Sequence, residues 1–231
     1  MSKTFTQLFT LLTLMLLFCQ TALAEKIEFK DESYNFRNIR SIAVYDLDFS
    51  NANIDNNVME KSLNAMYFKK ASQEKLDVLR YDVISRKMSL ALGQDMDLLA
   101  ENDWDTFNKL YDEHLPEYVD AYVTADVLQY ETQSIYHPEY TTWETKKERS
   151  YVKDSKGNRI EIEDEVLVPV THPAYYSSVI YEKVEFHVYD ARTGREVYSR
   201  QEWRDRDDDN GVDMFGRICA AFFKDLRKLT K

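Results

Sequence analysis

Cysteine, glycine and proline are all scarce in this chain. Its 231 residues include two cysteines, five glycines and four prolines. Two cysteines, Cys19 and Cys219, are too few for the disulfide framework of a small secreted domain. The few glycines leave no glycine-rich phosphate-binding loop and no flexible linker. These absences exclude a disulfide-stapled scaffold and the common nucleotide-binding motifs.

Basic charge is also in short supply. The chain has 30 Lys and Arg residues against 41 Asp and Glu residues, a net charge of −11. Proteins that bind nucleic acid or an anionic membrane surface need clustered Lys and Arg to displace counterions. The charge balance therefore argues against a nucleic acid or a lipid surface as the main partner, and the acidity favours solubility.

No apolar run reaches the ~20 residues that a transmembrane helix needs. The longest extends from Leu8 to Phe18, after the basic Lys3 and before Ala22-Leu23-Ala24. This order predicts a signal peptide over residues 1–24, cleaved after Ala24, and a periplasmic or secreted mature protein. Cleavage before Cys19 would instead give a lipid anchor. The bulky Phe18, where a small residue is wanted, argues against that alternative.

Strand and helix patterns alternate in the first half of the mature chain. The expected elements are a strand over Ser41–Phe49, a helix from an Asp55 N-cap to about Lys70, a strand over Arg80–Ser85, a helix over Glu101–Leu115, and a strand over Asp120–Gln133. A β-α-β-α-β order implies partly parallel pairing, with helices packed on the sheet.

The second half predicts antiparallel strands and a closing helix. Strict alternation over Ser178–Tyr189, the turn Asp190–Gly194 and the strand Glu196–Arg204 indicate a β-hairpin. A last helix is expected from Met214 to about Leu229, with Asp213 as its N-cap. We expect residues 25–231 to form a single α/β domain, bordering on α+β, with a mixed sheet.

A long insertion interrupts this domain. Residues Tyr140–Val152 are rich in basic side chains and Arg159–Val170 in acidic ones, and a polar turn over residues 154–158 separates them. Opposite charges that face each other across antiparallel strands favour the pairing. The pattern predicts a hairpin arm at about residues 138–173 with a solvated outer face.

Aromatic side chains gather in or near the arm. Those we single out are Tyr136, Tyr140, Trp143, Tyr151, Tyr175 and Tyr176. Tyr and Trp are enriched at protein interfaces because each offers a large area and a polar handle. Contact with a protein partner is one interpretation. Packing of the arm against the sheet is the other.

Two segments carry a family resemblance. The stretch IAVYDLDFSNANID and the later YDARTGREVYS turn, with the helices that follow, are arranged as in a known envelope domain. The pattern resembles the α/β domain of the amino-terminal part of TolB and of the curli-secretion lipoprotein CsgG. That resemblance implies binding and assembly at the cell envelope rather than catalysis.

Few residues of the sequence form a recognisable catalytic or metal-binding motif. Asp46 and Asp48 end the first strand, as in the Asp-x-Asp nucleophile motif of haloacid-dehalogenase phosphatases, but no partner residues can be placed for them. The acidic run over residues 205–213 resembles an EF-hand loop, yet Arg206 and Arg217 occupy ligand positions. We interpret the run as a solvated turn and leave open whether it binds a cation.

The four histidines show no close metal-ligand spacing, although His137 and His172 each begin a His-Pro-x-Tyr sequence. That repeat indicates either matching strand exits or a two-His site. We predict no catalytic residue, metal or cofactor. The expected function is a non-enzymatic periplasmic or envelope accessory that contacts a protein through the arm. The alternatives are a metal-dependent phosphatase-like hydrolase using Asp46 and Asp48, and a small-ligand binding protein.

Overall fold

The computed structural model describes residues 25–231 apart from 55, 154, 208 and 209. The expected signal peptide over residues 1–24, with Cys19, and the expected N-cap Asp55 lie outside the described residues. The chain divides into two compact units. One extends to Thr132 and resumes at Ile180–Lys231, and the other is Gln133–Val179. The fold class is α/β, as the sequence predicts.

A mixed sheet of six strands, in the order β1-β8-β7-β4-β2-β3, forms the centre of the first unit. Its strands are β1 (Glu25–Lys30), β2 (Ser41–Val44), β3 (Asp77–Arg80), β4 (Ala121–His137), β7 (Tyr175–Asp190) and β8 (Glu196–Asp207). Strand β2 pairs in parallel with both β3 and β4. Strand β1 pairs antiparallel with β8. The expected parallel pairing and the later hairpin are therefore confirmed.

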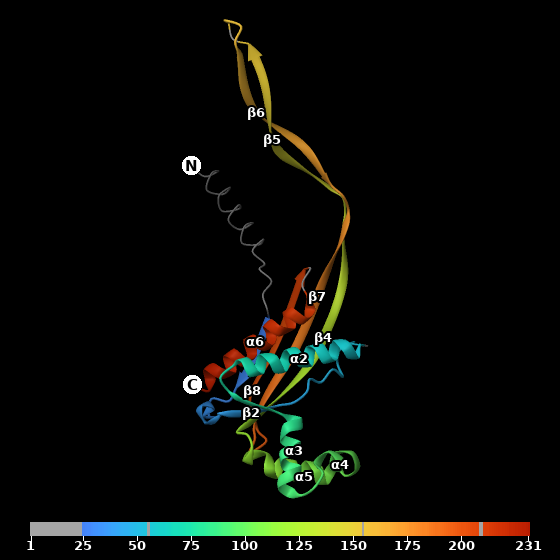
Figure 1. Ribbon diagram of the computed structural model, residues 1–231, viewed down its shortest axis with the longest axis vertical. Helices are drawn as coiled ribbons and strands as arrows, with labels where there is room; N and C mark the ends of the chain where they lie inside the picture. The colour runs from blue at the N-terminus through green and yellow to red at the C-terminus, as the bar shows by residue number, and fades with distance from the viewer. Residues whose placement is uncertain (1–24, 55, 154, 208–209) are drawn as a thin grey trace, which may run out of the picture. The chain divides into compact units, whose positions relative to one another are not determined.

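Two helices lie side by side over one face of this sheet, α2 (Asn57–Gln73) and α6 (Gly211–Leu229) (Figure 1). The stripe expected on the last helix is buried at Ile218, Phe222 and Leu226. Cys219 is buried in the same core, and burial raises the pKa of its thiol. A buried thiol held neutral is unreactive, which fits a structural role.

The remaining helices cluster on the opposite side of β2. They are α3 (Tyr81–Leu92), α4 (Met96–Asn102) and α5 (Trp104–His114), followed by a 3-10 turn over Leu115–Glu117. Successive side chains of a strand point to opposite faces. Ile42 and Val44 accordingly join the core under α2 and α6, whereas Ala43 packs with α3, α4 and α5.

The strand expected over Arg80–Ser85 is wrong. Strand β3 ends at Arg80, and helix α3 begins at Tyr81. Tyr, Val and Ile favour strands by propensity, but packing overrides propensity. Ile84 and Met88, four residues apart, are both fully buried on one face of α3. Gly93, with φ +65°, caps the C-terminal end of the helix.

The single helix expected over Glu101–Leu115 is wrong as well. Asp103 is the C-cap of α4 and also the N-cap of α5, where its side chain accepts a hydrogen bond from the Thr106 amide at 3.1 Å. Trp104, the first residue of α5, is 59% exposed. An Asp that caps a helix competes with helix continuation, which explains the break.

The expected N-caps are each replaced by an asparagine. Asn56 caps α2, which continues to Gln73 rather than about Lys70, and Asn210 caps α6. Their side chains accept hydrogen bonds from the amides of Val58 at 2.9 Å and Val212 at 3.0 Å. Asp213, the predicted cap, lies in the first turn of α6, where its negative charge suits the helix dipole.

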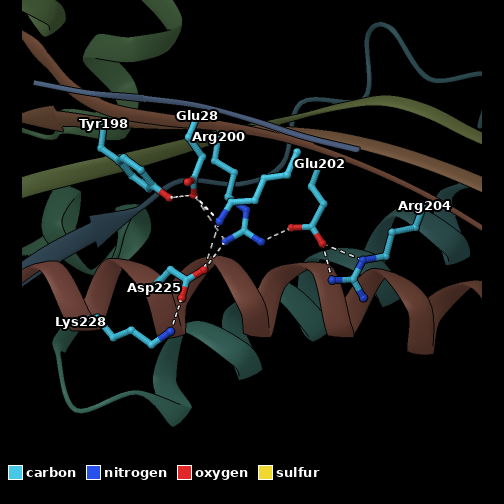
Figure 2. Close-up of polar contacts among 8 residues, drawn as sticks. Glu28, Tyr198, Arg200, Glu202, Arg204, Asp225 and Lys228 are labelled. Carbon is cyan, nitrogen blue, oxygen red and sulfur yellow. Dashed lines mark hydrogen bonds and ion pairs between the residues drawn. The ribbon is translucent and has the colours of Figure 1, made fainter. Parts of the chain in front are cut away.

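A buried charge network joins β1, β8 and α6 (Figure 2). The Arg200 guanidinium, 3% exposed, pairs with Glu202 and, at 2.8 Å, with Asp225 of α6. Burial lowers the pKa of Arg200, but the adjacent Glu202 carboxylate outweighs that effect and the pKa is raised. The arginine therefore stays charged in the core, and the network ties the edge of the sheet to the last helix.

The outer part of the network is half-buried. Tyr198 donates a hydrogen bond to Glu28 at 2.6 Å, and Lys228 reaches Asp225 at 2.6 Å. Each carboxylate in this cluster thus has a cationic or hydroxyl partner, the condition under which buried charge is tolerated.

In the part of the chain that the structure describes, no helix combines the length and the hydropathy that a membrane crossing requires.

Candidate functional site

The second unit contains the expected hairpin arm. Its strands are β5 (Tyr140–Lys153) and β6 (Arg159–His172). They pair antiparallel without a bulge, from Tyr140 opposite His172 to Lys153 opposite Arg159. The predicted pairing of the two segments is confirmed. Because the register is uninterrupted, each side chain can be assigned to one of the two faces of the ribbon.

The basic and acidic strands form the expected cross-strand ion pairs. Lys147 Nζ lies 3.0 Å from Glu163, and Arg149 Nε lies 3.4 Å from Glu161. All four side chains are solvent-exposed, so each pair contributes at most about 1 kcal/mol to stability.

One face of the ribbon presents Trp143 and Tyr151. Trp143 is 67% exposed and stands opposite Pro169. Leu167, one position further along the same face, is also exposed. Arg159 lies over the Tyr151 ring at 3.7 Å from its centroid. The patch of Trp143, Leu167 and Pro169 becomes recognisable only through the register, since Trp143 is distant in sequence from the other two.

The other face carries Tyr140 and a run of aliphatic side chains. Val152, Ile160 and Ile162 are exposed towards the turn. The three aromatic residues of β5 that were singled out from the sequence are thus divided between two faces, with Trp143 and Tyr151 on one and Tyr140 on the other.

Four of those residues meet in ring contacts where the arm begins and ends. Tyr136 contacts Tyr176 with ring centroids 5.1 Å apart. Tyr175 stacks on His137 at 4.4 Å, and Tyr140 stacks on His172 at 4.6 Å. Each ring still exposes about half of its surface or more, between 49% and 69%.

The two histidines are bound locally. His137 Nε2 lies 2.8 Å from the Ser177 hydroxyl, and His172 Nε2 lies 2.9 Å from the Thr142 hydroxyl. Among the described residues there is no group of three or more His, Cys, Asp or Glu side chains that could hold a metal ion. Because a hydroxyl and a tyrosine ring nearby hold each imidazole, the geometry fits matching strand exits.

The Asp46 and Asp48 carboxylates lie in the first unit and are exposed on either side of the buried Leu47. Asp48 forms a bridge with Asp126 and accepts a hydrogen bond from the Ser50 amide at 2.7 Å. Burial raises the pKa of Asp126, and the nearby Asp48 raises it further against the opposing effect of His187. The phosphatase-like hydrolase that would use Asp46 and Asp48 stays a hypothesis.

The acidic run that was considered as a cation site is only partly described, because Asp208 and Asp209 lie outside the described residues. Its Asn210 side chain is engaged in capping α6. Whether the run binds a cation stays open.

Comparison with known proteins gives no family. No family model matches this chain, and no curated protein matches it. Among solved structures, the PelC dodecamer from Paraburkholderia phytofirmans is similar over 89% of this chain and 98% of that one, with 9% identity and a TM-score of 0.46.

The lipoprotein GNA1162 from Neisseria meningitidis is similar over 81% of this chain and 98% of that one, with 12% identity and a TM-score of 0.37. With TM-scores below 0.5, neither likeness carries an argument about function. The resemblance to the TolB and CsgG type stays a prediction.

Proposed function

We propose that this protein is a non-enzymatic binding or assembly accessory of the bacterial periplasm or cell envelope. It contacts a protein partner through the hairpin arm and its flanks. The location rests on the expected signal peptide with cleavage after Ala24. The binding residues are those singled out from the sequence, namely Tyr136, Tyr140, Trp143, Tyr151, Tyr175 and Tyr176.

The observation that carries this proposal is the exposure of the aromatic side chains. Trp143 and Tyr176 expose more than two thirds of their surface, 67% and 69% respectively. Large exposed apolar areas in a soluble protein mark interaction sites. Tyr and Trp contribute much of the binding energy where such sites are buried by a partner.

The cores of the first unit give independent support. Both hydrophobic clusters are built from residues that precede Gln133 or follow Val179. Among the described residues from Gln133 to Val179, none belongs to either cluster. The aromatic residues of this segment therefore do not serve to fill those two cores.

A capture experiment with a deletion tests this function. Full-length protein and a variant lacking residues 139–171 are expressed in the native cells, crosslinked and purified under denaturing conditions. We expect a discrete envelope protein with the full-length chain only. Circular dichroism and thermal melting check that the shortened chain retains the α/β fold. Equal capture by both forms would overturn the proposal.

Matched point variants refine the test. Trp143→Ser removes an exposed ring from the arm, whereas Trp104→Ser removes a ring of similar exposure, 59%, from α5 in the first unit. We expect the first change to weaken capture by tenfold or more, as for a residue at the centre of an interface. The second change should leave capture unaltered. Equal losses from both would show that the arm has no special part in binding.

A further inference from the structure

A second candidate site lies in the first unit and includes none of the arm residues. It is a cavity of about 410 Å³ beside the starts of β2 and β4 and the end of β7. Three arginines line it, namely Arg37, Arg40 and Arg192. Pockets of about 300–1,000 Å³ are the usual size for small ligands. The convergence of three arginines on one cavity is notable because the chain is acidic, with a net charge of −11.

Asp120, one of two carboxylates in the lining, accepts hydrogen bonds from backbone amides. Its Oδ2 accepts hydrogen bonds from the amides of Arg40 at 2.9 Å and Ser41 at 3.1 Å. The Ser41 hydroxyl donates to the same oxygen at 3.1 Å. Asp120 thus fixes the start of β2 and offers this oxygen to no guanidinium group.

Asp190, the other carboxylate in the lining, also accepts hydrogen bonds from nearby groups of the chain. Its Oδ2 accepts a hydrogen bond from the Tyr34 hydroxyl at 2.8 Å. Its Oδ1 accepts from the amides of Arg192 and Thr193 at 3.1 and 2.9 Å. Burial raises the pKa of Asp190, but these donors outweigh it and hold the pKa below its usual value. Asp190 therefore remains an anionic acceptor that shapes the turn after β7.

The three guanidinium groups are left without such partners. Among the described residues, none forms an ion pair or hydrogen bond with the side chain of Arg37, Arg40 or Arg192. Arginines elsewhere in the chain do have them. Arg195 lies 2.7 Å from Asp31, and Arg80 lies 3.1 Å from Asp82. Even with both aspartates charged, the lining retains an excess of positive charge.

Arginine presents planar N–H donors that match the paired oxygens of carboxylate and phosphate groups. We propose that this cavity binds a small anionic solute with more than one oxyanion group, such as a polycarboxylate or a phosphorylated sugar. Arg37, Arg40 and Arg192 hold the oxyanion groups, while Asp120 and Asp190 keep the cavity wall in shape. This site is independent of the proposed protein partner.

Titration of the full mature chain with defined probes tests this assignment. The probes are citrate as the polycarboxylate, glucose 6-phosphate as the phosphorylated sugar, and glucose as the uncharged control. We expect saturable heat and amide shift changes with citrate or glucose 6-phosphate, and none with glucose. Saturation is required because phosphate-like anions also stabilise proteins without a site.

Variants locate the site. Arg40→Gln and Arg192→Gln each remove a charge-assisted hydrogen-bond donor and should weaken binding by about tenfold or more. Arg86→Gln, a change at an exposed arginine of α3 that is not part of the lining, should leave binding unchanged. The proposal would be overturned if neither citrate nor glucose 6-phosphate showed saturable binding. It would also be overturned if Arg86→Gln weakened binding as much as the two other changes.

Discussion

His137 stacks on Tyr175 with ring centroids 4.4 Å apart and ring planes 8° from parallel. The same contact recurs between His172 and Tyr140, at 4.6 Å and 15°. Each histidine of the repeated His-Pro-x-Tyr sequence thus pairs with the tyrosine of the other copy. The repeat brackets the arm in sequence and closes its base in space.

Loss of a stack should loosen the base of the arm. Aromatic pairs contribute about 0.5–1.5 kcal/mol beyond the area they bury. Tyr175→Leu should therefore speed amide hydrogen exchange around residues 133–137 and 175–179 by about twofold to tenfold. Trp143→Leu removes a ring for which the described residues show no ring contact, and it should leave that exchange unchanged. Equal protection in the Tyr175 variant and the wild type would contradict this role of the stack.

Removal of the buried guanidinium should be costly. Arg200→Met leaves the Glu202 carboxylate, 1% exposed, with Arg204 alone. Removal of one partner from a buried ion pair costs about 3–5 kcal/mol where no other partner remains. Because Arg204 remains, we expect a loss of free energy of unfolding of up to about 3 kcal/mol, which urea unfolding would measure. Arg204→Met, at a more exposed position, should cost less.

The double variant Arg200→Met with Glu202→Leu removes both charges and should recover much of that loss. A double variant as unstable as Arg200→Met alone would show that packing around the arginine, rather than the unpaired charge, is responsible.

The start of α6 requires glycine at position 211 because there is no room for a side chain. A Cβ atom there would collide with the Tyr130 hydroxyl and lie 2.9 Å from Tyr130 Cζ and 3.2 Å from Glu182 Oε1. Gly211→Ala should therefore lower the free energy of unfolding by about 1–3 kcal/mol, the usual range for overpacking. Adding Tyr130→Phe should restore part of the loss.

Gly216→Ala provides the comparison for that change. Its Cβ would meet the flexible end of Met66 at 3.0–3.1 Å, and the helix gains propensity from alanine. We expect a smaller loss than for Gly211→Ala in thermal melting. A loss from Gly211→Ala that is unaffected by Tyr130→Phe would rule out the steric explanation.

Acid should weaken the contact between α6 and the sheet. Burial raises the pKa of Asp225, but Lys228, Lys26 and Arg200 outweigh it and the pKa is lowered. A folded-state pKa below the unfolded value of about 3.9 stabilises the fold above that pH. This stability is lost as the pH falls through the folded-state pKa.

The free energy of unfolding should thus decrease as the pH falls below about 4, and Asp225→Asn should flatten the decrease. Glu101→Gln is the control and should leave the slope unchanged, because Glu101 is exposed and forms no ion pair with any described residue. A slope in Asp225→Asn equal to that of the wild type would contradict the assignment.

Local patterns predicted the parts of the fold that local chemistry determines. The alternation of Val184, Phe186 and Val188, the stripe on α6 and the charge-matched strands of the arm were all correct. The helix from Tyr81 was missed because its Tyr, Val and Ile residues have strand propensity, and only the burial of Ile84 and Met88 selects a helix.

The candidate sites were predictable to different degrees. The aromatic residues of the arm stand out in the sequence by their density, but their division between two faces follows from the pairing register. Arg37, Arg40 and Arg192 form no local pattern. They meet only because β2 begins and β7 ends at the same cavity. The hydrogen bonds that Asp120 and Asp190 accept from backbone amides cannot be inferred from residue type.

Site-specific photocrosslinking in intact cells tests the central claim most directly. A benzophenone amino acid is placed at position 143 in the arm and, as the control, at position 104 on α5. Both positions carry an exposed tryptophan in the native chain. If a protein partner binds the arm, we expect one discrete envelope protein crosslinked to position 143 and none crosslinked to position 104. No adduct from position 143, or the same adducts from both positions, would contradict it.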